Sequence, residues 1–250
     1  MLTIRLMGDV EILAGDRGEA LPRSRKTRAL LAYLAMIGRP VRRERLCELF
    51  WSLPDDPKGA LRWSLSRLRP VVSADGIDRI VADRQTVMLD RRGLVVDAVE
   101  LKAAGSRSLE NTPPDALAAL AGHCRGGFLD AVDLPDAYEF RAWRVAEREE
   151  LRAIEIRLRR RLARILAGSE DAVLHARRLV EIAPDEEESH VDLIAALAAA
   201  GRTREAEAHR AIAADRLDDS GALASPRFVV RPAPAAGGPR SADGAEPSAR

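Results

Sequence analysis

The change of hydrophobic period along the first 93 residues constrains the fold of this chain more than any other feature. Apolar residues alternate at the start, where Leu2, Ile4 and Leu6 share one face of a predicted strand, and a second strand follows the turn at Gly8. From about Arg25 the period becomes helical. Three helices are predicted, over about 25–37, 43–51 and 57–69. A pair of strands follows at 80–81 and 87–89.

This order of strands, three helices and a closing hairpin is typical of a winged helix, which is a helix-turn-helix unit completed by a β-hairpin. We therefore predict an α+β winged helix-turn-helix domain over residues 1–93. In such a unit the third helix, here 57–69, is the element that enters the major groove of DNA.

The second half of the chain has an almost wholly helical pattern. One very long helix is predicted over 136–167, and shorter ones follow at 170–183, 186–200 and 203–216. Pro184 and Gly201 separate the last three, as in stacked helix–turn–helix hairpins. We predict an all-α, tetratricopeptide-like (TPR-like) helical-hairpin domain over 94–218, and so a mainly α protein. Residues 219–250, rich in Pro, Ala, Gly and Ser, are predicted to be a disordered tail or a linker.

The net charge of +1 conceals an asymmetry between the two halves. Residues 1–93 carry 18 Lys/Arg and 12 Asp/Glu, a balance of +6, and residues 94–250 carry 22 and 27, a balance of −5. A basic front and an acidic rear fit a nucleic-acid-binding module joined to a different one. Because the chain has neither a signal-peptide pattern nor an apolar run near ~20 residues, it is predicted to be cytoplasmic.

The third helix carries the sharpest functional signal. Leu61, Leu65, Leu68 and Val72 form one apolar stripe, and no acidic residue lies between positions 58 and 69. Guanidinium groups on the opposite side suit phosphate oxygens and the O6/N7 edge of guanine, although a solvated surface is the plain alternative. From this helix, the residues predicted to contact DNA are Lys58, Arg62, Ser66, Arg67 and Arg69.

Three basic residues outside this helix complete the predicted DNA-binding set. Arg42 and Arg43 precede the second helix, where a helix N-terminus already favours anions, so that cations there suggest a phosphate nearby. Arg84 lies at the predicted tip of the hairpin and could reach phosphate or the minor groove. For each one, a solvated surface arginine is the alternative. Trp63, which points away from the apolar stripe, is predicted to pack on the hairpin or the second domain.

No catalytic, cofactor or metal signature is found in the sequence. It contains no phosphate-binding loop, no dinucleotide-binding glycine pattern, no zinc-protease motif and no nucleophile elbow. The four histidines are scattered through the second half, and Cys47 and Cys124 are lone cysteines, which suggests neither a metal site nor a disulfide. We predict that the protein is not an enzyme.

Several segments resemble one family of bacterial regulators. The runs KTRALLAYLA (26–35), VRRERLCELFW (41–51) and GALRWSLSRLRPVV (59–72) resemble the OmpR-type winged helix of the SARP transcriptional regulators. In the second half, VVDAVEL (95–101), the run 124–163 beginning CRGGFLDA, and the run 176–209 are similar to the bacterial transcriptional activation domain, or BTAD, with its TPR-like hairpins. The resemblance covers roughly residues 2–217.

The resemblance implies a DNA-binding transcriptional regulator, most often an activator. It implies binding of double-stranded promoter DNA, often at repeated sites that a homo-oligomer could occupy, contact with RNA polymerase, and a place in the cytoplasm at the nucleoid. Two alternatives stay open. The chain could be a TPR-like protein-interaction scaffold, or the regulatory front end of a larger signalling protein, in either case without specific DNA binding.

Overall fold

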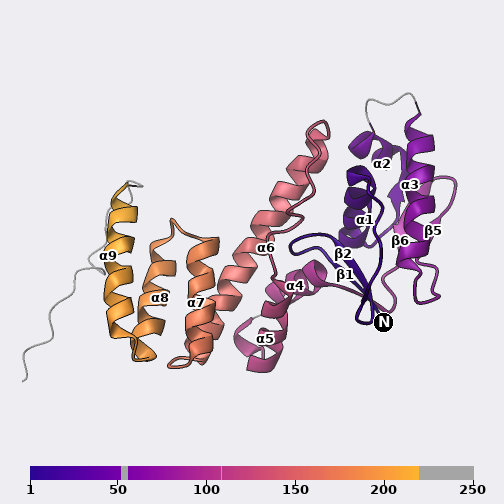
Figure 1. Ribbon diagram of the computed structural model, residues 1–250. Coiled ribbons are helices and arrows are strands. Elements are labelled where there is room, and N and C mark those ends of the chain that lie inside the picture. Colours follow the sequence, from indigo (N-terminus) through magenta and orange to yellow (C-terminus); the bar gives the residue numbers. More distant parts are fainter. Residues whose placement is uncertain (52–55, 108, 220–250) are drawn as a thin grey trace, which may run out of the picture.

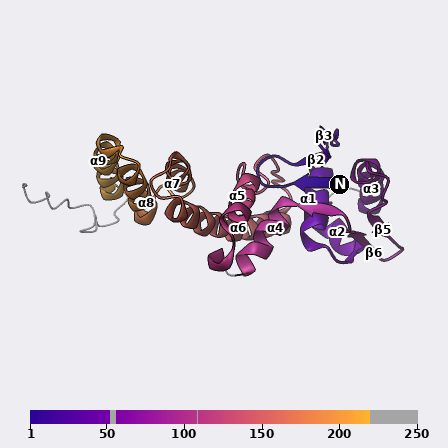
Figure 2. The same cartoon turned by 90° about the horizontal axis from the view of Figure 1, so that it is seen from below.

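The computed structural model describes residues 1–51, 56–107 and 109–219, and the tail predicted at 219–250 lies almost entirely outside them. The molecule is elongated, with β-strands and short helices at one end and a row of helices at the other (Figure 1, Figure 2). The prediction of a mainly α protein, with a winged helix followed by helical hairpins, is confirmed.

A four-stranded sheet begins the chain. It consists of β1 (Leu2–Arg5), β2 (Glu11–Ala14), β3 (Arg17–Gly18) and β7 (Leu94–Val96), in the order β3-β2-β1-β7. The two strands predicted around the Gly8 turn, β1 and β2, pair in antiparallel fashion, whereas β7 pairs with β1 in parallel. The domain boundary proposed after residue 93 therefore falls just before a strand that completes the N-terminal sheet.

The winged helix follows in the predicted order. α1 (Arg25–Ile37) begins at Ser24, whose side chain accepts a hydrogen bond from the Thr27 N–H, and ends at Gly38 in the left-handed conformation that glycine adopts without strain. α2 (Arg43–Phe50) and α3 (Pro57–Val72) come next, and α3 extends three residues beyond its predicted end. The wing consists of β5 (Ile80–Ala82) and β6 (Thr86–Leu89), and β4 (Val41–Arg42) pairs with β6.

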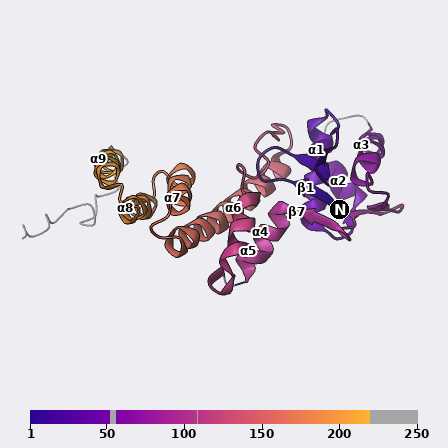
Figure 3. The ribbon, with the colours of Figure 1, turned by 60° about the horizontal axis from the view of Figure 1, so that its bottom comes forward.

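The rear domain consists of helices that pack in sequence. α4 (Asp97–Ser106), a short 3-10 turn (Leu109–Asn111) and α5 (Pro114–His123) lie beside α6 (Tyr138–Ile165), which forms the axis of the domain (Figure 3). The last helices are α7 (Glu170–Ile182), α8 (Glu187–Ala199) and α9 (Thr203–Asp219), each packed against the one before it. None of the described helices combines the length and the apolar character that a membrane span requires.

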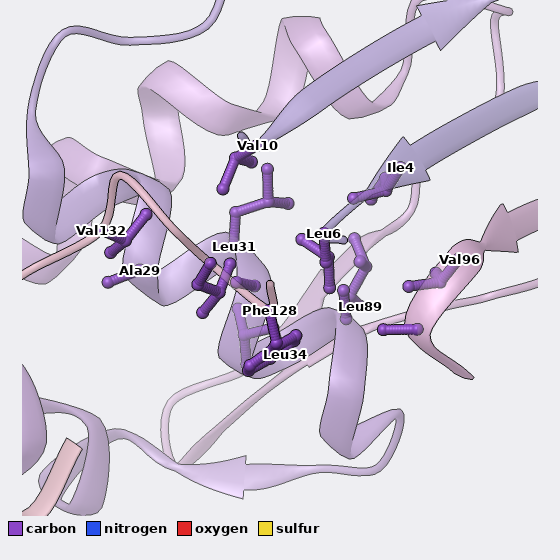
Figure 4. Close-up of a cluster of buried hydrophobic side chains, with 14 of the residues drawn as sticks. Ile4, Leu6, Val10, Ala29, Leu31, Leu34, Leu89, Val96, Phe128 and Val132 are labelled. Atoms are coloured by element: carbon purple, nitrogen blue, oxygen red, sulfur yellow. The ribbon is translucent and has the colours of Figure 1, made fainter. Parts of the chain in front are cut away.

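One hydrophobic cluster joins the N-terminal part of the chain to α4, α5 and α6, and the helices from α6 onward add two smaller clusters. The first cluster contains Leu6 and Leu34 together with Phe128, which is 1% exposed (Figure 4). The Asp97 carboxylate accepts hydrogen bonds from the N–H groups of Leu6 (2.7 Å) and Met7 (3.1 Å), and burial raises the pKa of this carboxyl group. These buried contacts between residues 90 positions apart hold the rear domain in a defined orientation to the winged helix.

Candidate nucleic-acid interface

α3 is fixed to the protein along one side only. Its Leu61, Leu65, Leu68 and Val72 are buried, as the periodicity predicted. The buried Ser64 hydroxyl also hydrogen-bonds Thr27 of α1, with 3.0 Å between the two oxygens. Since apolar burial and a satisfied polar contact both lie on this side, the orientation of the opposite side is set by the core.

The way in which α3 begins accounts for the glycine in its first turn, Gly59. Pro57 occupies the first helical position, and the Asp56 carboxylate caps the helix by accepting a hydrogen bond of 2.7 Å from the Gly59 N–H. A Cβ atom at residue 59 would collide with that carboxylate. Gly59 thus leaves room for the capping carboxylate, a role that does not depend on a ligand.

The end of α3 is fastened to the wing by Arg79, whose side chain is fully buried. Its guanidinium donates to the carbonyl of Val72 at 3.0 Å and pairs with the Asp75 carboxylate, with 2.7 Å between Nη2 and Oδ2. This pairing lowers the pKa of Asp75 to about 2. Arg79 thus sets the angle between the last turn of α3 and β5. The sequence does not reveal this role, because the fold brings the carbonyl groups of Val72 and Gly93 to the Arg79 guanidinium.

The outward side of α3 carries an aromatic and cationic surface. Trp63 is 50% exposed, and the Arg67 guanidinium lies over its ring with 5.4 Å to the ring centre. In such a cation–π contact the face of the ring attracts the guanidinium electrostatically. The prediction that Trp63 packs on the wing or the rear domain is wrong, because its partner is Arg67 on the next turn of the same helix.

Two arginines of α3 are paired with carboxylates at the surface. Arg69 Nη1 lies 3.1 Å from Asp78 Oδ2, and Arg62 Nη2 lies 3.7 Å from Asp56 Oδ2. All four side chains are at least 42% exposed, so water and salt weaken these pairs and both guanidiniums can exchange partners. The Ser66 hydroxyl donates to the Trp63 carbonyl at 2.7 Å, which leaves its oxygen able to accept a further hydrogen bond.

A cavity of about 810 Å³ opens between the start of α2, the first turns of α3 and the turn of the wing. We call it the wing cavity. Five basic residues line it, against the two acidic residues Glu44 and Asp83: they are Arg42, Arg43, Lys58, Arg62 and Arg84.

The β4–β6 pairing brings the basic residues of the wing cavity together. It places Arg42 opposite Thr86, and the Arg43 Nε donates to the Asp83 carbonyl at 2.8 Å. The Asp83 carboxylate accepts hydrogen bonds from the N–H groups of Gln85 (2.7 Å) and Thr86 (2.6 Å), which lower its pKa. Asp83 is thus occupied in shaping the turn, and the balance of the cavity stays positive.

The structure places the eight predicted residues in two adjoining groups. Arg42, Arg43, Lys58, Arg62 and Arg84 line the wing cavity, while Ser66, Arg67 and Arg69 continue along the outward side of α3. Among the described residues, no group of three His, Cys, Asp or Glu side chains is placed to hold a metal ion. The arrangement presents cations, a hydroxyl and an aromatic ring on one helix and one hairpin at the end of the molecule (Figure 1).

The fold and this surface together define a winged-helix protein with a helical-hairpin rear domain. No protein-family model matches the chain, and no curated protein matches it. Among solved structures it is similar to Mycobacterium tuberculosis EmbR in complex with a low-affinity phosphopeptide, with a TM-score of 0.62 and 19% sequence identity. The match covers 91% of this chain and 63% of that chain. EmbR is a SARP-family regulator, and the likeness shows that this chain shares the fold of EmbR, as the sequence resemblance predicted.

Proposed function

We propose that this protein is a sequence-specific DNA-binding regulator of transcription. In the proposed complex α3 enters the major groove, with Arg62, Ser66, Arg67 and Arg69 facing base edges and phosphates. The observation that carries the proposal is the wing cavity, in which basic residues from three segments converge beside the outward side of α3.

The wing cavity supplies the phosphate contacts in this proposal. The N-terminal turns of α2 and α3 both line it, and helix N-termini favour anions through their unpaired N–H groups and their dipoles. Arg42, Arg43 and Lys58 would hold the DNA backbone, while Arg84 at the turn of the wing reaches the adjacent phosphate or the minor groove. Phosphate contacts fix the position of the protein on the duplex, and base contacts give the sequence preference.

The SARP-type fold supports the finer parts of the proposal. We infer that the rear domain, proposed to span residues 94–218, contacts RNA polymerase and that the protein activates transcription, acting at the nucleoid in the cytoplasm. Binding to repeated sites by more than one copy belongs to the same proposal. The shared core supports a rigid link between the two functions, because a rear domain held by Asp97 and Phe128 moves with the winged helix.

Selection of bound sequences from a pool of random duplexes tests the proposal. We expect the full chain to enrich a defined motif at ~0.15 M salt, with guanines at the positions read by arginine forks. Non-specific DNA binders still bind with Kd values of ~10⁻⁴–10⁻⁶ M under these conditions. If the chain enriched no motif and bound duplex DNA more weakly than such proteins do, the proposal would be contradicted. A protein partner for Trp63 and the winged helix would then be favoured.

A further inference from the structure

A second basic site lies in the rear domain. A cavity of about 370 Å³ opens between the end of α4, the 3-10 turn and the last turns of α6. We call it the arginine pocket, after the five guanidinium groups that line it, which belong to Arg107, Arg157, Arg160, Arg161 and Arg164. Its lining includes a single acidic residue, Glu110, whose backbone carbonyl accepts a hydrogen bond from Arg161.

The positive charges of the arginine pocket are incompletely balanced by the protein. Arg160 is held by Asp192 (2.7 Å) and Glu188 (2.8 Å) of α8, and Arg164 lies 4.0 Å from the same Asp192 carboxylate. Arg107 and Arg157 are exposed and have no carboxylate partner among the described residues. Like charges spaced three and four residues apart destabilise a helix, and the dipole of α6 compensates only those in its last turn.

Two donor atoms in this cluster are buried without a hydrogen-bond partner. They are Nη2 of Arg160 and Nε of Arg161. A buried donor without a partner destabilises the protein, and such atoms are few in native structures. An anion in the pocket would neutralise the cluster and accept hydrogen bonds from the exposed guanidiniums of Arg107 and Arg157.

The pocket is well separated from the proposed DNA interface. The start of α6 touches the winged helix, where Glu139 pairs with Arg45 at 2.5 Å. Arg157 lies 18 residues further along the helix, which corresponds to about 27 Å along its axis. Figure 1 shows the end of α6 on the side of the molecule occupied by α7, away from α3. A duplex seated on α3 and the wing is therefore not the natural ligand of this pocket.

The walls of the pocket indicate the kind of anion. Leu109 and Ile165 add apolar surface beside the guanidiniums, and Ile165 is 42% exposed. Guanidinium forks match phosphate oxygens, and cavities from about 300 Å³ upward hold small ligands. Several unneutralised cations suit a ligand with several negative charges better than one with a single carboxylate.

We propose that the arginine pocket binds a nucleoside di- or triphosphate, with its phosphates on the guanidiniums of α4 and α6 and its base against Ile165. The pocket adjoins the contact between α6 and α8, which Arg160 makes with its carboxylate partners. Occupancy would therefore stabilise the packing of the hairpin helices on α6.

Isothermal titration calorimetry of the full chain with inorganic triphosphate, ATP, AMP and sulfate tests the proposal. We expect ATP and inorganic triphosphate to bind with Kd values below about 1 mM, and AMP and sulfate to bind far more weakly. Arg157→Gln should weaken both polyphosphates by about tenfold, because one charge-assisted contact is lost. The control is Arg204→Gln, which replaces an exposed arginine of α9 outside the pocket. This variant should bind both polyphosphates as tightly as the wild type does.

Ile165→Ser distinguishes the contribution of the nucleoside to binding from that of the phosphates. It should weaken ATP several-fold and leave inorganic triphosphate unchanged, since only the nucleoside touches Ile165. No polyphosphate binding by the wild type, or equal binding by wild type and Arg157→Gln, would overturn the proposal. Displacement of triphosphate by duplex DNA from the Arg62/Arg67/Arg69→Ala protein would also overturn it, because the pocket would then be a DNA contact. Equal affinities for ATP in the wild type and Ile165→Ser would overturn the nucleoside assignment.

Discussion

The arginines of the two domains have different partners. In the rear domain most of them are neutralised within the protein: Arg159 pairs with Glu155 at 2.7 Å, and Arg202 pairs with Glu170 and Glu205 at 2.7 Å. In the winged helix Arg42, Arg43, Lys58 and Arg84 have no carboxylate partner among the described residues. These rear arginines are neutralised by the protein, and Arg202 joins the start of α9 to α7 through Glu170. The four front cations remain available to an external anion.

This difference is more informative than the net charge. A balance of +6 in the first 93 residues is compatible with an ordinary surface, and it becomes a candidate DNA interface because the unpaired cations lie together on α3, α2 and the wing. The arginine pocket is the exception in the rear domain, and the same reasoning, applied to its unpaired guanidiniums, leads to a second proposed anion site. Substitution of a paired arginine in the rear domain should therefore lower stability, whereas substitution of a basic residue of the winged helix should weaken DNA binding.

The largest effect is expected at Arg159 of the rear domain. Its side chain and that of Glu155 are only 9% and 4% exposed, and its Nη2 also donates to the Cys124 carbonyl at 3.2 Å. Arg159→Ala leaves a buried carboxylate with only a more distant cation, Arg178 at 3.7 Å, and should lower the free energy of unfolding by about 3 kcal/mol. Urea denaturation measures this change.

The matched control for that experiment is Arg204→Ala, which removes an exposed arginine and should change stability by no more than about 0.5 kcal/mol. The DNA sequence preference of folded Arg159→Ala should equal that of the wild type. If Arg159→Ala lost its DNA sequence preference without losing stability, the distinction between structural and DNA-contacting arginines would be contradicted.

Substitution of Arg62 or Arg69 should change DNA recognition and leave stability nearly unchanged. Each alanine substitution should reduce the discrimination between the selected duplex and one with a substituted guanine by about 1–3 kcal/mol, if the guanidinium reads a base edge. Their ion pairs are exposed, so stability should change little. The ratio of the two Kd values measures discrimination. An unchanged ratio with both affinities reduced would show that the residue contacts phosphate instead.

The wing cavity should contribute to affinity for every sequence alike. Arg43→Ala and Arg84→Ala should each reduce the slope of log K against log salt by about one unit, because one phosphate contact is lost. Arg84 makes no hydrogen bond or ion pair among the described residues, so its substitution leaves the turn of the wing intact. Fluorescence anisotropy over a range of salt concentrations gives the slopes. Arg202→Ala of the rear domain is the control, and an equal change there would contradict this account.

The smallest effect is expected at Trp63. Trp63→Leu removes the ring beneath Arg67 and should weaken binding to the selected duplex by about 0.5–1 kcal/mol, the usual value of an exposed cation–π contact. Trp63→Phe should retain part of this contribution. Unaltered DNA binding together with a large loss of stability would show that Trp63 serves packing.

The hydrophobic pattern predicted most of the fold because the relevant signals are local. The apolar stripe of α3, the left-handed Gly38 and the long α6 all follow from spacing and capping. The pairing of β7 with β1, and the hydrogen bonds from Leu6 and Met7 to Asp97, join residues about 90 positions apart, and local periodicity carries no information about such partners.

The residues of the candidate site remain a prediction from the sequence, and their arrangement could not be predicted from it. The basic residues followed from charge and helical position, but the wing cavity depends on the pairing of β4 with β6, two strands 44 positions apart, and β4 was not predicted. An exposed aromatic side chain is unusual, so the sequence favours packing of Trp63 on a neighbouring element, and helical spacing does not show that the Arg67 guanidinium lies over its ring. The burial of Arg79 depends on carbonyl groups supplied by α3 and by the residues before β7.

The most direct test of the central claim compares the wild type with the Arg62/Arg67/Arg69→Ala protein on the selected duplex and on a scrambled duplex. If these guanidiniums read bases, the triple variant should keep its fold by circular dichroism, lose affinity for the selected duplex by roughly a thousandfold, and bind both duplexes equally. If the variant instead binds the selected duplex as tightly and as selectively as the wild type, α3 is not the element that recognises DNA.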